Sequence, residues 1–292
     1  MHDIRSLTPE DIPALLPPRP AISNKSTFGR VVALCGSVGM CGAAYLCAKA
    51  AYRTGCGLVE IITPEQNRIP LQTLLPEAIV TCYDSDNPDT AAVAKAVRRA
   101  DAIAIGCGLG TSITAARVLD TALTAATIPV VLDADALNIM AADPQHWQTP
   151  KVPVIITPHP GEMSRLTGLT IEQVLKNVPE LAASFAKERG VVCLLKHHKT
   201  AISDGNVTYI NQFGNSGMAT GGSGDVLTGI IVALLAQSKN YPKATAPDPC
   251  KTAALGALIH SLAGDRAAAR LGEYALMASD IIDEIGSVIK KS

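Results

Sequence analysis

The chain has 292 residues, of which 48% are hydrophobic, 17% are charged and only 3% are aromatic, and its formal net charge is −1. This balance is typical of a compact globular protein and gives no electrostatic case for binding nucleic acid or an anionic membrane surface. The polar, proline-rich segment 238–249 separates two helical segments, not two domains. We therefore expect one domain over residues 1–292, with residues 1–28 as an N-terminal arm.

Residues 1–20 carry acidic residues and prolines where a signal peptide would have a basic region followed by an apolar one, so none is expected. The longest apolar run, residues 230–236, is far shorter than the roughly 20 residues of a membrane helix. The eight cysteines form no C-x-x-C pair and mostly lie in apolar segments, which predicts small buried thiols in the reducing cytoplasm and neither a disulfide framework nor a zinc site. A catalytic thiol is the less favoured alternative, because no neighbouring histidine or cationic residue is evident.

A short helix is expected at residues 9–16, and after residue 28 apolar strands alternate with Ala-rich helical segments. The predicted strands cover residues 31–35, 58–63, 78–82, 102–105, 130–132, 154–157 and 191–195. The predicted helices between them cover residues 43–53, 65–74, 90–99, 112–126, 136–141 and 171–189. Strands that are apolar throughout and separated by helices predict an α/β fold with a mostly parallel central sheet covered on both faces.

The last third of the chain departs from this alternation. Asp204-Gly205 favours a tight turn, so residues 200–203 and 207–210 are predicted to form a β-hairpin that closes the sheet. From Asp225 onward the pattern is helical, with helices expected at residues 225–237, 252–271 and 279–289.

The most informative stretch is residues 211–237, in which a glycine-rich loop leads into an apolar helix. Glycine lets a ligand approach the backbone closely, and the free N–H groups at a helix N-terminus bind anions. We therefore expect Gly222, Ser223 and Gly224 to form an anion hole. Asp225 is either the N-cap of the helix or a catalytic base beside that hole, and we favour the base.

Ligands of open α/β sheets bind at the carboxyl ends of the strands, so the other strand-end loops are examined for chemistry. The small residues at 36–44 allow close approach of a substrate but are weak evidence alone. The loop 106–111 is glycine-rich, yet its third glycine is out of place and no acidic residue is placed for a ribose. A dinucleotide-binding Rossmann motif is therefore rejected.

Two further strand ends carry carboxylates. Asp133 and Asp135 suit either Mg²⁺ held through waters or hydrogen bonds that order the loop, and Asp135 is equally well interpreted as a helix N-cap. Two prolines flank His159 and are expected to fix its backbone. Glu162 either caps the following helix or binds a hydrated metal.

The loop after the predicted strand 191–195 is basic. Its residues are Lys196, His197, His198, Lys199 and Thr200. Their charge indicates contact with phosphate, with a solvated loop as the alternative, and the two histidines alone do not make a metal site. Together the loops predict a nucleotide phosphate held next to Asp225, which is an arrangement for phosphoryl transfer to an alcohol.

Three motifs give the chain a resemblance to a known family. They are LDADALN at residues 132–138, TPHPGE at 157–162 and GNSGMATGGSGDVLTGII at 214–231. The chain resembles the NAD(P)H-hydrate dehydratase family of the ribokinase-like superfamily, whose signature is a glycine-rich anion hole that ends in a catalytic Asp. The resemblance runs from about residue 25 to the C-terminal helices. Its departures are mild, with Cys35 and Ser26 standing where the family usually has glycine.

The resemblance implies a ribokinase-like three-layer fold and repair of hydrated nicotinamide cofactors. The family uses a nucleotide to turn the C6 hydroxyl of NADHX or NADPHX into a leaving group, restoring NADH or NADPH. Asp225 would be the base on the hydroxyl of the S epimer. The implied hydrate-binding positions are Ala43, Gly110, His159 and Asp225, and the implied nucleotide positions are Lys196, His197, His198, Lys199, Thr200 and Gly224.

The resemblance also implies cofactors and partners. Mg²⁺ is expected, with Glu162 as a contact through water, and ADP is favoured over ATP as the co-substrate, giving AMP and phosphate. A homo-oligomer, by resemblance a homotetramer, is expected. No fused epimerase domain is seen, so a separate NAD(P)HX epimerase is the expected functional partner.

Two alternatives remain open at this level. A ribokinase-like kinase acting on a thiazole or pyrimidine alcohol fits the loop before Asp225 equally well, whereas the TPHPGE motif does not fit it. A nucleotide-binding regulator without catalysis is disfavoured, because a regulator has no need for Asp225 as a base.

Overall fold

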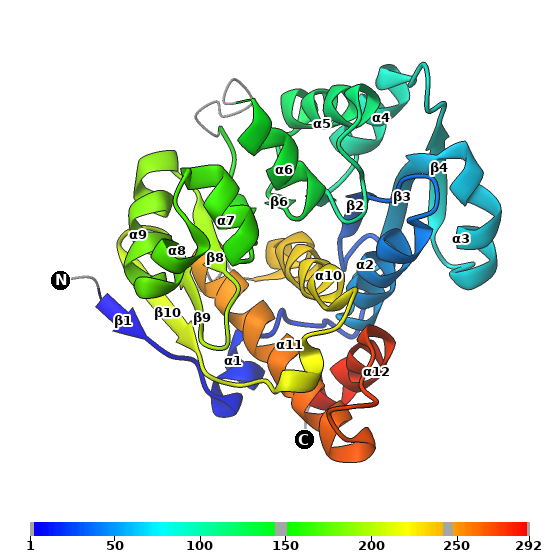
Figure 1. The fold of residues 1–292 in the computed structure, drawn as a ribbon. Helices are drawn as coiled ribbons and strands as arrows, with labels where there is room; N and C mark the ends of the chain where they lie inside the picture. The colour runs from blue at the N-terminus through cyan, green and yellow to red at the C-terminus, as the bar shows by residue number, and fades with distance from the viewer. Residues whose placement is uncertain (1–2, 144–150, 242–247, 291–292) are drawn as a thin grey trace.

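The computed structural model describes residues 3–143, 151–241 and 248–290. Its centre is a ten-stranded sheet of order β1-β10-β9-β8-β7-β6-β5-β2-β3-β4 (Figure 1). The strands are β1 (Asp3–Arg5), β2 (Arg30–Leu34), β3 (Leu58–Pro64), β4 (Ile79–Tyr83), β5 (Ala102–Ile105), β6 (Val130–Leu132), β7 (Val154–Ile156), β8 (Val192–Leu195), β9 (Thr200–Ser203) and β10 (Val207–Asn211). Only β9 runs antiparallel to its neighbours, so the predicted mostly parallel sheet is confirmed.

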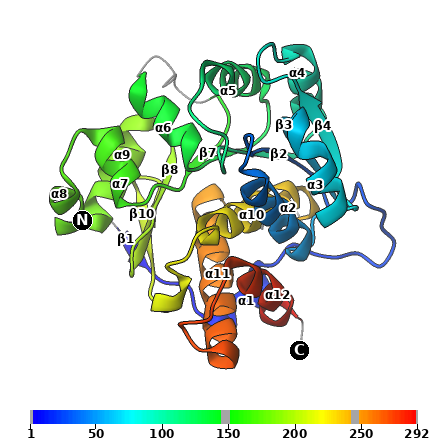
Figure 2. The same ribbon diagram turned by 45° about the vertical axis from the view of Figure 1, so that its right-hand side comes forward.

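Helices cover both faces of this sheet. The α-helices are α1 (Ile12–Leu15), α2 (Cys41–Arg53), α3 (Arg68–Leu74), α4 (Thr90–Arg98), α5 (Ile113–Ala125), α6 (Asp135–Ala142), α7 (Pro160–Thr167), α8 (Ile171–Lys176), α9 (Val178–Arg189), α10 (Ser223–Ala236), α11 (Pro249–Leu271) and α12 (Ala278–Ile289). Figures 1 and 2 show α4, α5 and α6 on one side of the sheet and α2, α10 and α11 on the other.

The two layers have separate apolar cores because successive strand residues point to opposite faces. In β2, Val31 and Ala33 pack with α2, α10 and α11, whereas Val32 and Leu34 pack with α4, α5 and α6. A third cluster joins α10, α11 and α12. Burial on both faces explains why the strands are apolar throughout.

The helix α10 lies at the centre of one layer. Every residue from Val226 to Ala236 is buried, as expected for a helix that is apolar on all sides. It crosses α2 at very close range, because a Cβ placed on Gly229 would lie 2.2 Å from the carbonyl oxygen of Cys47. No helix among the described residues is both long and apolar enough to span a bilayer.

Three predictions about the elements were wrong. The hairpin β9–β10 forms, but it does not close the sheet, because the exposed strand β1 pairs in parallel beyond β10. The segment predicted as one helix over 171–189 is two, since Pro179 cannot follow a continuous helical turn and Asn177 is extended (φ −153°). The helix α7, which begins at Pro160, was not predicted. Part of the predicted segment 238–249 lies outside the described residues.

Candidate active site

The candidate site lies at the carboxyl edge of the sheet. The parallel strands β8, β7, β6, β5 and β2 are neighbours in that order, so the loops that follow them meet at one edge. These loops carry Lys196, His159, Asp133 and Gly110, and α10 begins beside them.

Asp225 is not the N-cap of α10. The helix begins at Ser223, its N-cap is Gly222 (φ 90°), and Asp225 is the third helical residue. A Cβ placed on Gly222 would lie 3.8 Å from Asp225 Oδ2, so the carboxyl group folds back over the glycine turn. Gly222 and Asp225 thus stand together at the positive end of the helix, where an anion is stabilised.

Both polar groups of Ser223 have partners: its backbone N–H donates to the carbonyl oxygen of Thr220 at 3.4 Å, and its hydroxyl contacts α11. The Oγ atom is buried and lies 3.3 Å from Nε2 of His260 on α11. Burial lowers the pKa of His260 to about 4, so the imidazole is neutral at pH 7. The anion hole at Gly222, Ser223 and Gly224 stays a prediction, and the Ser223 hydroxyl is not available to it.

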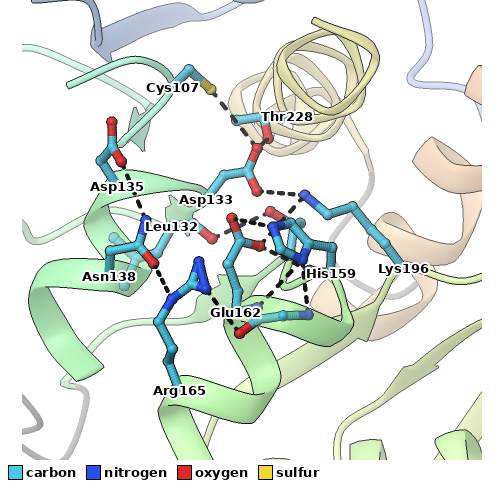
Figure 3. A network of polar contacts seen from close by, with 12 residues as sticks. Cys107, Leu132, Asp133, Asp135, Asn138, His159, Glu162, Arg165, Lys196 and Thr228 are labelled. Atoms are coloured by element: carbon cyan, nitrogen blue, oxygen red, sulfur yellow. Dashed lines mark hydrogen bonds and ion pairs between the residues drawn. The ribbon is translucent and has the colours of Figure 1, made fainter. Parts of the chain in front are cut away.

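A buried ion pair lies next to Gly224 (Figure 3). Asp133, which is 1% exposed, accepts hydrogen bonds from Lys196 Nζ at 2.8 Å and from Thr228 Oγ1 at 2.9 Å. A Cβ placed on Gly224 would lie 3.3 Å from Lys196 Nζ and 3.6 Å from Asp133 Oδ2. The Lys196 ammonium therefore lies beside the start of α10, next to the predicted anion hole.

The charges of this cluster act on one another. Burial alone would lower the pKa of Lys196, but the Asp133 and Glu162 carboxylates raise it above its usual value, so the ammonium stays charged. Burial raises the pKa of Asp225 to about 9, with further increases from Cys107 and Asp133. Asp225 is thus a carboxyl group that holds a proton firmly, which is the property of a strong base.

His159 is the N-cap of α7. Its Nδ1 accepts hydrogen bonds from the backbone N–H groups of Gly161 at 2.9 Å and Glu162 at 3.3 Å. The ring proton of the neutral imidazole is therefore on Nε2, which lies 3.3 Å from Glu162 Oε1. Burial, together with Lys196 and Arg165, lowers the pKa of His159.

Glu162 completes a capping box with His159. Its Oε2 accepts the backbone N–H of His159 at 2.8 Å, so Glu162 caps α7, the unpredicted helix in which it lies, and not the predicted helix that follows it. The imidazole is fixed by this reciprocal pair, and not by the flanking prolines alone. Lys196 Nζ lies 3.9 Å from Glu162 Oε2, which links this loop to the ion pair.

Asp135 orders the loop after β5. The N-cap of α6 is Ala134 (φ 49°), so the N-cap interpretation of Asp135 is wrong. Its Oδ2 accepts the backbone N–H of Gly110 at 2.8 Å. Ala43 approaches the same loop closely, because a Cβ placed on Gly108 would lie 2.8 Å from Ala43 Cβ. Gly110 and Ala43, two of the predicted hydrate-binding positions, are thus brought close together by this loop.

The remaining predicted residues follow β8. The rings of His197 and His198 meet edge to face, with Nδ1 of His198 3.3 Å from Nε2 of His197. Thr200 Oγ1 donates to the carbonyl oxygen of His197 at 3.0 Å and closes this turn. Lys199 and His198 are exposed. The turn is compact, and Lys196 stands at its start.

Sequence reasoning missed two supporting residues. Thr228 was hidden in an apolar run, although a polar residue three positions after Asp225 was a usable signal. Asp265 on α11 accepts the backbone N–H of Gly214 at 3.0 Å and the side chain of Asn215 at 2.9 Å, and so holds the start of the glycine-rich loop. Nothing in the sequence near Asp265 indicates that contact.

Comparison with known proteins places this geometry in a family. A family model described as NAD(P)H-hydrate dehydratase matches residues 31–287. The bifunctional NAD(P)H-hydrate repair enzyme of Moorella thermoacetica is 40% identical over 285 residues, covering 94% of this chain and 52% of that protein. The ADP-dependent (S)-NAD(P)H-hydrate dehydratase of Neisseria meningitidis is 38% identical over 247 residues, covering 83% and 78%. The chain thus spans about half the length of the bifunctional relatives it matches.

The same family appears among solved structures. The ADP/ATP-dependent NAD(P)H-hydrate dehydratase from Bacillus subtilis, co-crystallized with ATP/Mg²⁺, superposes with a TM-score of 0.83 at 33% identity and with 97% of each chain covered. The ribokinase-like fold implied by the sequence motifs is therefore confirmed. The chain belongs to the NAD(P)H-hydrate dehydratase family.

Proposed function

We propose that the protein dehydrates the S epimer of NADHX and NADPHX at the expense of ADP, restoring NADH and NADPH and releasing AMP and phosphate. The observation that carries the proposal is the partly buried Asp225 carboxyl at the N-terminus of α10, with Lys196 Nζ beside Gly224. A base, a fixed cation and free N–H groups at one point are what phosphoryl transfer to a hydroxyl requires.

Each residue has a part in this reaction. Asp225 takes the proton of the hydrate hydroxyl as its oxygen attacks the terminal phosphorus of ADP. Lys196 and the N–H groups at the start of α10 stabilise the charge that develops on the phosphoryl oxygens, and AMP leaves. Loss of phosphate and of a ring proton then restores the double bond. His159, Gly110 and Ala43 hold the hydrated nicotinamide, and residues 196–200 with Gly224 hold the nucleotide.

Mg²⁺ on the phosphates fits the residues present. Carboxylate oxygens are its preferred protein ligands. Both oxygens of Glu162 contact His159, at 2.8 and 3.3 Å, but each keeps a lone pair for a water. Glu162 would therefore hold the ion through water. The ion, when bound, neutralises phosphate charge.

The cellular context completes the proposal. All eight cysteines are free thiols, which supports a reducing compartment, and we assign the protein to the cytoplasm. A homotetramer is the proposed assembly. The proposed partner is a separate NAD(P)HX epimerase, which would convert the R epimer into the substrate.

The decisive test is a direct assay. The full chain is incubated with (S)-NADHX, ADP and Mg²⁺, and the absorbance of the reduced nicotinamide is followed. Recovery of NADH with stoichiometric AMP is expected. Absence of recovery with ADP and with ATP would contradict the proposal. The kinase alternative predicts a stable phosphorylated product from hydroxyethylthiazole and ATP, which the proposed function does not.

A further inference from the structure

Three cysteine side chains converge behind Asp225. Cys35 follows β2, Cys47 lies on α2, and Cys107 lies in the loop after β5. All three are 0% exposed, and their sulfur atoms lie within 4.8 Å of one another. None takes part in a disulfide. Buried thiols usually pack as small apolar groups, but three sulfurs that face one point also form a ligand set.

The spacing fits one soft metal ion. A metal–sulfur bond of about 2.3 Å separates two sulfur ligands of the same ion by about 4 Å. The three sulfurs therefore need to close by less than about 1 Å to bind a shared ion. Their backbones are already tied, because Gly36 N–H donates to the carbonyl oxygen of Cys107 at 2.8 Å. Little reorganisation is required.

The chemistry of the set is that of a soft-ion site. Thiolate sulfur selects soft cations over Mg²⁺ or Ca²⁺. We propose that Cys35, Cys47 and Cys107 form a three-thiolate site for a single soft d¹⁰ cation of the Cu⁺, Zn²⁺ and Cd²⁺ class.

The site shares one residue with the candidate active site. Cys107 Sγ, an Asp133 oxygen and an Asp225 oxygen also lie within 4.8 Å of one another. A cation on the three sulfurs therefore has the Asp133 and Asp225 carboxylates close to one of its ligands, and an Asp225 carboxylate that coordinates the cation cannot accept a proton. Occupancy of the thiolate site would stop the reaction. This consequence rests on the proposed function, whereas the binding itself does not.

Binding exchanges protons for metal without redox chemistry. One Cd²⁺ forms three bonds to sulfur, and the thiol protons are released to solvent. The apparent affinity must therefore rise with pH. Cd²⁺ is the probe, because its charge-transfer band with thiolate sulfur is visible in the ultraviolet.

The first experiment titrates the reduced, metal-free full chain with Cd²⁺. We expect one Cd²⁺ ion to bind tightly to each chain and to produce the charge-transfer band. Cys47→Ala, which removes a sulfur outside the Cys107, Asp133 and Asp225 cluster, should weaken that binding at least tenfold, and Cys35→Ala/Cys47→Ala/Cys107→Ala should abolish it. Cys193→Ala/Cys250→Ala removes two other buried thiols and should titrate as the unaltered chain does. Thermal midpoints establish that each variant is folded.

Two outcomes would overturn the site. One is the absence of a tight equivalent in the unaltered chain, and the other is the same equivalent in Cys47→Ala. A separate experiment measures activity. One equivalent of Cd²⁺ should abolish turnover, and a chelator should restore it. Turnover of Cys47→Ala should be insensitive to that concentration of Cd²⁺. Cadmium bound at the three thiols with full turnover would overturn the inhibition. If the protein has no hydrate dehydratase activity, the Cd²⁺ titration still decides whether the thiolate site exists.

Discussion

The chemistry of Asp225 depends on neighbours that are remote in the chain. Its position at the start of α10 is local, but Cys107 and Asp133, which raise its pKa together with burial, come from loops about 100 residues earlier. A carboxyl group with a pKa of about 9 is neutral at pH 7. Its reactivity should therefore be visible in the response to pH.

The first prediction concerns catalysis as a function of pH. Because Asp225 must lose its proton before it can act as a base, kcat/KM should rise roughly tenfold per pH unit below about 9 and then level off. Initial rates with (S)-NADHX and ADP between pH 6 and 9.5 measure this. A flat profile across that range would show that Asp225 is ionised at neutral pH.

The second prediction concerns stability as a function of pH. The pKa of Asp225 is raised from 3.8 to about 9 in the folded chain, so the folded state holds a proton that the unfolded state has lost. Between those values stability falls as pH rises. Asp225→Asn, which mimics the protonated form, should remove that slope while lowering turnover by about 10²–10⁴. Urea unfolding at pH 5, 7 and 9 compares the two chains.

The third prediction separates the partners of Asp133. Asp133→Asn leaves Lys196 with only the Glu162 carboxylate, 3.9 Å away, as a counter-charge. It should destabilise the fold by about 2 kcal/mol, less than for a fully buried pair because the Lys196 side chain is 22% exposed. Thr228→Val removes one hydroxyl donor and keeps the ion pair, so a loss of about 1 kcal/mol is expected. Equal losses in denaturant unfolding would argue against the ion pair as the dominant contact.

At the scale of elements, the contact between α10 and α2 sets the position of the site. The two helices approach at Gly229, where a side chain would meet the backbone of Cys47 at 2.2 Å. An interior glycine normally weakens a helix. Here it permits the close crossing that places Asp225 beside the loops after β5 and β6.

The fourth prediction tests that crossing. Gly229→Ala should destabilise the fold by about 3 kcal/mol, because the methyl group meets backbone that cannot rotate away. Gly286→Ala on α12 is the matched control, since a Cβ there meets nothing within 4 Å. The control should gain about 0.5–1 kcal/mol from helix propensity. A similar change in both variants, measured by urea unfolding, would show that the crossing relaxes easily.

Elements with strong local signals were predictable and those fixed by tertiary contacts were not. The apolar strands β2 to β8 were located because both of their faces are buried. The strand β1 was missed because its three residues are exposed and pair only with β10, some 200 residues away. The helix α7 was missed because the prolines around His159 suggested a rigid loop, whereas Pro160 starts the helix.

For the whole molecule, the order of the strands brings the site together. The sequence indicated which loops carry polar residues, because each follows an apolar strand. It could not indicate that Lys196 pairs with Asp133, since that contact depends on β8, β7 and β6 being neighbours. The contacts of Thr228 with Asp133 and of Asp265 with Gly214 also join segments that are far apart in the chain, so the sequence did not indicate them. The polar loops at the carboxyl edge of the sheet were predictable, and their mutual contacts were not.

The fifth prediction concerns the edge of the sheet. Deleting residues 1–5 removes β1, whose residues are all exposed, and leaves β10 as the edge strand. Stability should fall by about 1 kcal/mol or less, and turnover should be unchanged, because β1 lies at the end of the sheet away from Asp225. Ile4→Pro, which blocks one backbone donor in the pairing, should act in the same direction. Loss of turnover in either variant would assign β1 a part in the site.

The complete burial of α10 has a consequence for the timing of local opening. Its amide hydrogens from Ile230 onward are hydrogen-bonded inside the helix and shielded by α2 and α11. They should exchange with deuterium only through global unfolding, whereas the glycine-rich residues just before Ser223 should exchange through local fluctuations. Asp225 therefore stands at the boundary between the slowest and the fastest exchanging parts of the chain, so the loop can admit and release ligands while the base stays in place.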